Sequence, residues 1–105
     1  MKEWTELQLN RPLKEGTAVV GTAPDGNKYA VCKVENRIYV CENRCRHQGG
    51  PLGNGFLSGK TLACAWHGWE YDISDGSCMS NPDEKPLKVY ESRWIDEKIF
   101  FLEAG

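Results

Sequence analysis

Two short groups of residues combine a cysteine with a histidine, and they are the part of the sequence best suited to chemistry. Cys45-Arg46-His47 is the first group and Cys64-Ala65-Trp66-His67 is the second, with sixteen residues between His47 and Cys64. The chain has only 2 histidines, and each follows a cysteine within three residues. Thiolate sulfur and imidazole nitrogen are ligands for zinc, copper and iron. The spacing therefore predicts a metal centre held by these two cysteines and two histidines.

The three remaining cysteines, Cys32, Cys41 and Cys78, do not extend this pattern. The total of 5 is odd, and the first residues lack the apolar stretch of a secretory signal, so a disulfide framework is not expected. The Cys41-x-x-x-Cys45 spacing does not complete the plant-type ferredoxin pattern. Because free cysteine commonly behaves as a small buried hydrophobe, we expect that role for all three.

The order of the ligands separates two kinds of metal centre. A single zinc ion with two cysteines and two histidines is one interpretation, but finger-type zinc sites place both cysteines in one arm and both histidines in the other. Here each arm has one of each, and a single residue separates Cys45 from His47. A two-iron centre suits this distribution better, provided that the fold brings both cysteines to one iron and both histidines to the other.

Short runs of alternating apolar and polar residues, separated by Gly, Pro, Asn and Asp, predict an all-β fold of antiparallel strands. We expect residues 28–34 to form a half-buried strand that pairs with residues 37–41 across a turn at Glu35-Asn36. The other expected strands are residues 16–21, 61–64, 68–73, 87–91 and 98–103. Each Cys/His group then lies in a loop after a strand, so two loops from neighbouring hairpins can enclose one metal centre.

Length and composition indicate one ordinary globular domain. The chain has 105 residues, of which 27% are charged and 40% hydrophobic, and domains cluster near about 100–150 residues. Lys and Arg number 13 against 15 Asp and Glu, so the net charge of −2 gives no basic surface for nucleic acid. No apolar run approaches the roughly 18 residues that cross a bilayer. We therefore expect a cytoplasmic protein with no nucleic-acid or membrane partner.

The Cys/His groups and the residues around them resemble the Rieske iron–sulfur family. The two groups, at this separation, are similar to the Rieske ligand signature. The Gln-Gly-Gly-Pro-Leu run at residues 48–52 and the second loop at residues 64–72 also resemble that family. The segment from Gly76 to Pro82 resembles the proline-containing segment that covers the cluster in family members. The resemblance extends over most of the chain.

The resemblance implies a fold and a cofactor. The fold is a Rieske fold, a single domain over residues 1–105 in which an antiparallel β-sandwich carries a small cluster-binding subdomain of two loops, inserted at about residues 43–83. The cofactor is one Rieske-type [2Fe–2S] cluster, with Cys45 and Cys64 on the inner iron and His47 and His67 on the outer iron. Neutral imidazoles in place of two thiolates make such a cluster less negative, so it accepts an electron more readily.

The chain departs from the respiratory-chain members of that family at three positions. Those proteins have an extra cysteine in each loop, joined as a disulfide, where this chain has Gly50 and Trp66, so that disulfide cannot form here. They also have a serine, bonded to a bridging sulfide, where this chain has Trp69, whereas Tyr71 is retained. We expect Trp69 and Tyr71 to pack behind the cluster. Because fewer hydrogen bonds to sulfur lower the potential, we expect the low end of the roughly −150 to +300 mV Rieske range.

The resemblance implies electron transfer as the function. With both histidines in the cluster, none remains for the mononuclear iron of a terminal oxygenase, and the chain has no dinucleotide-binding fingerprint. We therefore expect a Rieske-type ferredoxin that is not itself an enzyme. It would pass single electrons from a flavin-containing NAD(P)H reductase to a terminal oxygenase, of the type that hydroxylates aromatic rings. A Rieske-like small subunit of a larger reductase, such as nitrite reductase, and a zinc-stapled interaction module are the alternatives.

Partners of such a carrier would dock transiently on the face formed by His47 and His67. Arg44 and Arg46 beside the first histidine are candidates for contact with an acidic partner, and Trp66 is a candidate for the docking face. Because a carrier has to release its partners quickly, we expect small, weak interfaces and a monomer.

Overall fold

The computed structural model describes residues 4–45, 49–66 and 68–102. Over these residues the chain forms short β-strands and one 3₁₀ turn, and every strand pair is antiparallel. In chain order the elements are β1 (Trp4–Leu9), β2 (Ala18–Thr22), β3 (Lys28–Val34), β4 (Arg37–Glu42), η1 (Leu52–Asn54), β5 (Phe56–Ser58), β6 (Thr61–Ala63), β7 (Glu70–Asp72), β8 (Val89–Tyr90), β9 (Ser92–Ile95) and β10 (Lys98–Leu102). The predicted all-β, antiparallel fold is confirmed.

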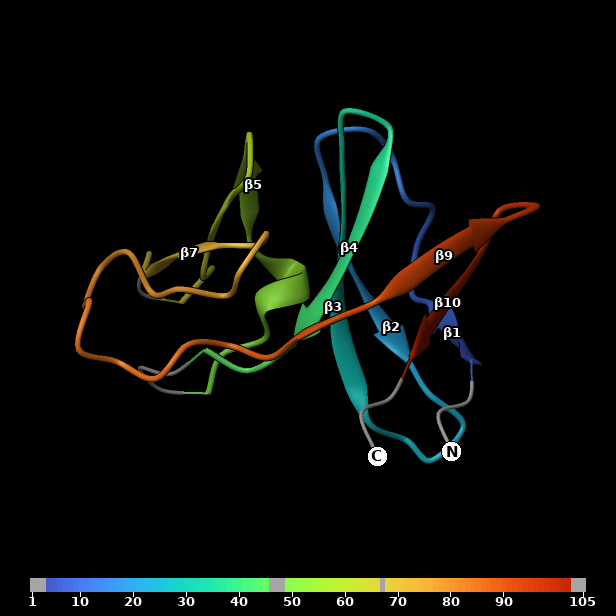
Figure 1. The fold of residues 1–105 in the computed structure, drawn as a ribbon, viewed down its shortest axis with the longest axis horizontal. Helices are drawn as coiled ribbons and strands as arrows, with labels where there is room; N and C mark the ends of the chain where they lie inside the picture. Colours follow the sequence, from blue (N-terminus) through green and yellow to red (C-terminus); the bar gives the residue numbers. More distant parts are fainter. Residues whose placement is uncertain (1–3, 46–48, 67, 103–105) are drawn as a thin grey trace.

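The strands form a large sheet and a small sheet. The large sheet has the order β8-β4-β3-β2-β1-β10-β9, and the small one has the order β5-β6-β7. Only Glu91 separates β8 from β9, although these strands lie at opposite edges of the large sheet. The large sheet therefore folds back on itself, and the Ser92 hydroxyl donates a hydrogen bond to the Ile38 carbonyl across the closure at 3.1 Å. In Figure 1 the large sheet occupies one half of the molecule, and the small sheet with its loops occupies the other.

The hairpin of β3 and β4 forms as predicted because its two-residue turn suits the twist of the strands. Glu35 and Asn36 both have positive φ, 52° and 62°, which is the conformation of a type I′ turn. The carboxylate of Glu15 accepts hydrogen bonds from both of their backbone N–H groups, at 2.7 and 2.9 Å. A contact from a distant loop thus stabilises a backbone conformation that is uncommon for residues other than glycine.

Strand β3 is buried on both faces, so the expectation of a half-buried strand was wrong. Ala30, Cys32 and Val34 face the core cluster shared with the small sheet. Tyr29 and Val31 face a second cluster inside the folded large sheet, where the Tyr29 ring lies 4.5 Å from the ring of Phe101. The alternation of the sequence separates these two faces correctly. The alternation could not show that residues between β4 and β8 cover the face of Ala30, Cys32 and Val34, which would otherwise be exposed.

Three strands were absent from the sequence-based expectation. Strand β9 is an edge strand whose residues are mostly exposed, and β5 has only 3 residues, so neither has a clear apolar alternation. Strand β1 has a single fully buried residue, Leu7, and pairs with β10 near the other end of the chain. The expected strands at residues 61–64, 68–73 and 87–91 are present but shorter.

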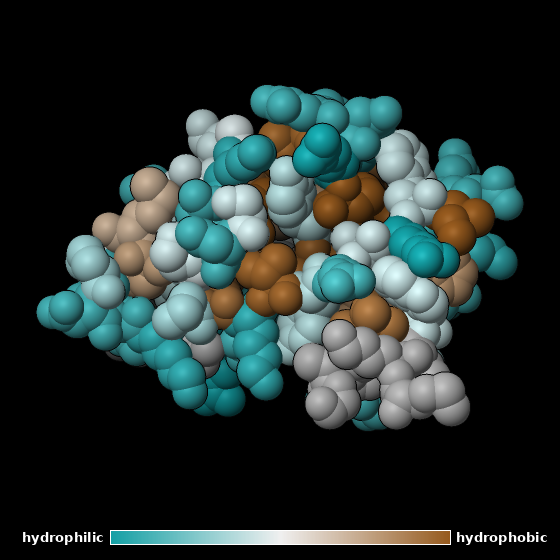
Figure 2. All heavy atoms as spheres, viewed as in Figure 1, coloured by the Kyte–Doolittle hydropathy of each residue, from teal (hydrophilic) through white to brown (hydrophobic). Residues whose placement is uncertain are grey.

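Polar residues cover most of the face drawn in Figure 2, and hydrophobic residues appear there in small, separate groups. None of the described segments forms a helix that is long and apolar enough to cross a membrane.

Glu15 gives the hairpin a stability that depends on pH. The backbone N–H groups of Asn36 and Glu35 lower the pKa of the Glu15 carboxyl from its ordinary 4.5. A lowered pKa in the folded state stabilises the protein above the ordinary pKa, and that contribution is lost as pH falls through the folded-state value. We predict that Glu15→Gln flattens the decline of the thermal midpoint at acid pH, measured over a pH series. Glu91→Gln, an exposed carboxylate elsewhere, serves as the control, and equal declines in both variants would contradict the prediction.

Candidate metal centre

The two cysteine-containing loops have the same backbone arrangement. In the first loop the Cys45 N–H donates to the Gly50 carbonyl at 2.9 Å, and the Gly49 N–H donates to the Cys45 carbonyl at 2.8 Å. In the second loop the Cys64 N–H donates to the Trp69 carbonyl at 2.8 Å, and the Gly68 N–H donates to the Cys64 carbonyl at 2.9 Å. The two loops therefore begin at a cysteine and close at the same offsets from it.

A glycine at the same place in each loop makes this arrangement possible. Gly49 and Gly68 each lie four residues after their cysteine, and their φ angles are 72° and 73°. This left-handed conformation favours glycine because a Cβ atom would be strained there. The Cys-to-Gly spacing is thus the feature of the sequence that gives the loops their common shape.

The first loop is anchored to the large sheet through η1. The side-chain oxygen of Asn43 accepts a hydrogen bond from the Gly53 N–H at 2.6 Å, and its carbonyl accepts one from the Leu52 N–H at 3.1 Å. The Arg11 guanidinium donates to the Gly53 carbonyl at 3.2 Å and to the Ala18 carbonyl of β2 at 2.6 Å. Sequence reasoning identified neither Arg11 nor Asn43, because no motif marks a contact between such distant segments.

The second loop is anchored to the small sheet. It connects β6 to β7, and the antiparallel pairing of Ala63 with Glu70 holds its two ends together. The two loops nevertheless meet, since a Cβ atom at Gly50 would lie only 3.0 Å from Cys64 Sγ. Two loops from different sheets therefore converge on one small region.

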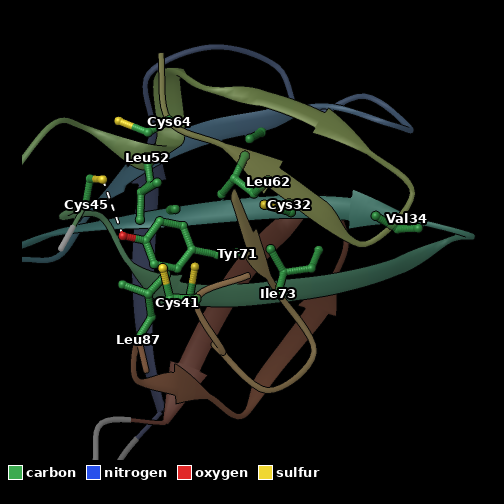
Figure 3. Packing of buried hydrophobic residues seen from close by; sticks show 13 residues of the cluster. Cys32, Val34, Cys41, Cys45, Leu52, Leu62, Cys64, Tyr71, Ile73 and Leu87 are labelled. Atoms are coloured by element: carbon green, nitrogen blue, oxygen red, sulfur yellow. Dashed lines mark hydrogen bonds between the residues drawn. The ribbon is translucent and has the colours of Figure 1, made fainter. Parts of the chain in front are cut away.

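Cys45 and Cys64 are buried at the same edge of the core cluster (Figure 3), and each is 2% exposed. Cys45 Sγ lies 3.3 Å from the hydroxyl oxygen of Tyr71, a fully buried residue of β7. Because a thiolate can only accept, the Tyr71 hydroxyl is the donor in this hydrogen bond whenever Cys45 is deprotonated. Tyr71 and the half-buried Trp69 pack into this core cluster, and their place behind the iron–sulfur cluster stays a prediction.

The other two members of the expected ligand set, His47 and His67, lie outside the described residues, as does Arg46. Within the described ranges there is no group of three or more Cys, His, Asp or Glu side chains that could hold a metal ion. The structure therefore brings together the two cysteines and leaves the placement of the two histidines as a prediction. Of the candidates for docking, Arg44 and Trp66 are exposed.

The remaining cysteines, Cys32, Cys41 and Cys78, are buried in the same core cluster as Cys45 and Cys64. Desolvation raises the pKa of the Cys32 thiol strongly, and the neighbouring Cys41 adds to this. Desolvation, followed by the charge of Glu42, raises the pKa of Cys41 to about 12. The prediction that Cys32, Cys41 and Cys78 are buried is confirmed.

The raised pKa values make two thiols unreactive, because the thiolate is the nucleophile in alkylation. We predict that iodoacetamide near neutral pH leaves Cys32 and Cys41 unmodified in the native protein, as measured by mass spectrometry of the peptides. The same peptides from denatured protein, which should be modified, are the control. Modification of Cys32 or Cys41 in the native protein at the denatured rate would contradict their burial.

Comparison with known proteins shows the family and several relatives. Residues 3–91 match the Rieske [2Fe-2S] domain family. The chain is 30% identical over 89 residues to the ferredoxin component of the naphthalene 1,2-dioxygenase/salicylate 5-hydroxylase systems of Ralstonia sp., and the match covers 85% of each chain.

Two solved structures have the same fold. One is a complex of reduced oxygenase and oxidised ferredoxin in carbazole 1,9a-dioxygenase, of which a matching chain has a TM-score of 0.79 and 24% identity, with 93% of this chain and 91% of that chain covered. The other is a putative NADH-dependent nitrite reductase small subunit from Mycobacterium tuberculosis, with a TM-score of 0.83, 19% identity, and coverage of 100% and 98%.

Proposed function

The chain belongs to the Rieske [2Fe-2S] domain family, and we propose that it is a one-electron carrier, the ferredoxin component of a multicomponent oxygenase system. The observation that carries this proposal is the similarity, over 85% of both chains, to a ferredoxin component of a naphthalene dioxygenase system. With both histidines of the sequence assigned to the cluster, none remains for the mononuclear iron of an oxygenase. On this proposal the protein transfers electrons and is not the catalyst of the oxygenation.

The cofactor is one Rieske-type [2Fe–2S] cluster, which supplies a redox centre for single electrons. The residues present suit such a group. Cys45 and Cys64 offer two buried thiols in loops with the same hydrogen-bond frame, and thiolates are the ligands that iron–sulfur clusters require. The Tyr71 hydroxyl is already placed to donate to Cys45 Sγ. Two thiolate sulfurs favour a soft metal over a hard one.

We assign four ligands to this cluster, namely Cys45, His47, Cys64 and His67. The equal backbone frames of the two loops support the cysteine assignment, and the spacing of the histidines within the family signature supports the other two. On this assignment, residues 43–83 act as a cluster-binding subdomain, and the folded large sheet is the base that carries it.

The partners that we propose are a flavin-containing NAD(P)H reductase, which supplies the electrons, and a terminal oxygenase that hydroxylates aromatic rings. The carbazole 1,9a-dioxygenase complex, in which a ferredoxin of this fold is bound to its oxygenase, supports the second partner. Docking would be transient, at the face formed by His47 and His67, and the carrier would be monomeric and cytoplasmic. A small, weak interface of this kind permits rapid exchange between the two partners.

The nitrite reductase small subunit is a second candidate, because its fold matches over all of this chain. The two functions differ in how the partner is held. Turnover with separately added reductase and oxygenase supports a carrier, whereas a stable stoichiometric complex in a pull-down supports a subunit.

The cluster and its ligands can be tested together. We predict that the purified protein is coloured and, after reduction with dithionite, gives a [2Fe–2S] electron paramagnetic resonance signal. Alanine substitution of Cys45, His47, Cys64 or His67 should abolish the signal, because each removes a ligand. Cys32→Ala is the matched control and should retain it. A colourless protein that contains zinc and gives no signal would contradict the proposal.

Tyr71 should raise the reduction potential of the bound cluster. Its hydroxyl donates to Cys45 Sγ, and a hydrogen bond to sulfur is worth more when reduction makes the sulfur more negative. A net hydrogen-bond contribution of about 1 kcal/mol corresponds to roughly 40 mV for one electron. We predict that Tyr71→Phe lowers the midpoint by this amount in potentiometric titration.

Tyr39→Phe, which removes a hydroxyl from β4, is the control for that titration and should leave the potential unchanged. An unaltered midpoint in Tyr71→Phe would show that this hydrogen bond does not influence the cluster. The same titration tests the expectation that Trp69, in place of a hydrogen-bonding serine, keeps the potential at the low end of the Rieske range. A wild-type midpoint above about +100 mV would contradict this expectation.

A further inference from the structure

The indole of Trp66 lies against Gly50 of the opposite loop. A Cβ atom built at Gly50 would lie 2.9 Å from Trp66 Cδ2 and 3.1 Å from Trp66 Cε3. The same Cβ would lie 3.0 Å from Cys64 Sγ. Optimal carbon–carbon contacts are about 3.5–4.0 Å, so not even a methyl group fits between the backbone of Gly50 and the indole. Gly50, the benzene ring of the indole and the Cys64 sulfur therefore form one close contact.

This contact joins two loops whose main anchors lie in different sheets. The first loop is fixed to the large sheet by Arg11 and Asn43, and the second loop is fixed to the small sheet by the pairing of β6 with β7. Contacts between side chains and the opposite loop therefore contribute to how the two loops meet. Tyr71 provides one from inside the core, through its hydroxyl and Cys45 Sγ. Trp66 provides another on the solvent side.

The burial of these residues shows what the indole covers. Trp66 is 57% exposed, whereas Gly50 is buried and Cys64 is 2% exposed. One side of the indole therefore faces solvent while the other lies over Gly50, beside the Cys64 sulfur. Truncation of this side chain would open a space next to a sulfur that is otherwise shielded.

We propose that Trp66 is a positioning residue that closes the metal centre on its solvent side. Its indole holds the second loop against Gly50 of the first loop and keeps water and chelators away from Cys64 Sγ. The inference rests on the proposed function in so far as the group held between the loops is the [2Fe–2S] cluster. It assigns to Trp66 a role in retaining the cofactor, distinct from contact with a partner protein.

The test is the rate at which the loaded protein loses its cluster. Visible absorption and circular dichroism are followed at a fixed EDTA concentration, in air and under argon. Residues that surround metal ligands commonly contribute about 10–100-fold in metal affinity, so Trp66→Ala should lose the cluster about tenfold faster than wild type. Trp66→Phe keeps a smaller ring over Gly50 and should lie between the two. Trp94→Ala removes another partly exposed indole, 41% exposed in β9, and should behave as wild type.

A double-mutant cycle tests the contact itself. Gly50→Ala should also speed the loss, because its methyl group displaces the indole, and no positive φ at Gly50 adds backbone strain. If the contact is responsible, Gly50→Ala costs less when Trp66 is already alanine, since the displaced ring is absent. Strictly additive effects would contradict the proposed contact.

The other outcomes are equally decisive. Equal cluster lifetimes in wild type, Trp66→Ala and Trp94→Ala would overturn the inference. So would a Trp66→Ala protein with weaker oxygenase binding and an unchanged lifetime, since that result makes Trp66 a docking residue only. If Trp66→Ala cannot be loaded, wild-type lifetimes in both Trp66→Phe and Gly50→Ala would overturn it. A wild-type protein without a cluster would overturn the proposed function and this inference with it.

Discussion

The metal centre depends on one geometric constraint: two loops that belong to different sheets must bring a cysteine each to the same edge of the core. The chain meets this constraint with one backbone design used twice, in which the cysteine carbonyl accepts a hydrogen bond from a glycine N–H four residues later. The positive φ at Gly49 and Gly68 favours glycine there, so these glycines support the frame that carries each cysteine. The rest of the fold serves to fix the two loops relative to each other.

The folded large sheet provides the fixed base. Strand β3 is buried on both faces. On one face, Ala30 and Cys32 pack in the core cluster that contains Cys45 and Cys64, and on the other face Tyr29 and Val31 pack in the cluster inside the folded sheet. A domain of this size has a modest core, and a metal site that joins two of its parts adds stability that packing alone does not supply. Desolvation in this core raises the pKa of the Cys32 and Cys41 thiols, whereas Cys45 and Cys64 lie at the edge of the cluster in Figure 3.

The sequence was most informative where the relevant residues are close together in the chain. The two Cys/His groups, the Glu35-Asn36 turn and the hairpin that it joins are local features, and the structure has the turn, the hairpin and both cysteines where they were expected. Contacts between distant segments could not be predicted. Arg11 and Gly53 are 42 residues apart, and the pairing of β1 with β10 joins the two ends of the chain. The double burial of β3 and the contact between Trp66 and Gly50 also depend on the complete fold, because no local pattern records what covers a strand or a loop.

Aromatic side chains set the electrostatic surroundings of the two sulfurs. Tyr71 donates a hydrogen bond to Cys45 Sγ from the core, whereas Trp69, half-buried against the same cluster, has no hydroxyl to donate. Trp66 covers the neighbouring loop with carbon atoms in place of water. A hydroxyl missing at Trp69 and carbon atoms in place of water at Trp66 each reduce the stabilisation of additional negative charge. These two residues therefore favour the oxidised state and the release of an electron. This property suits a carrier that has to pass each electron on, and it follows from the same packing that keeps the two loops together.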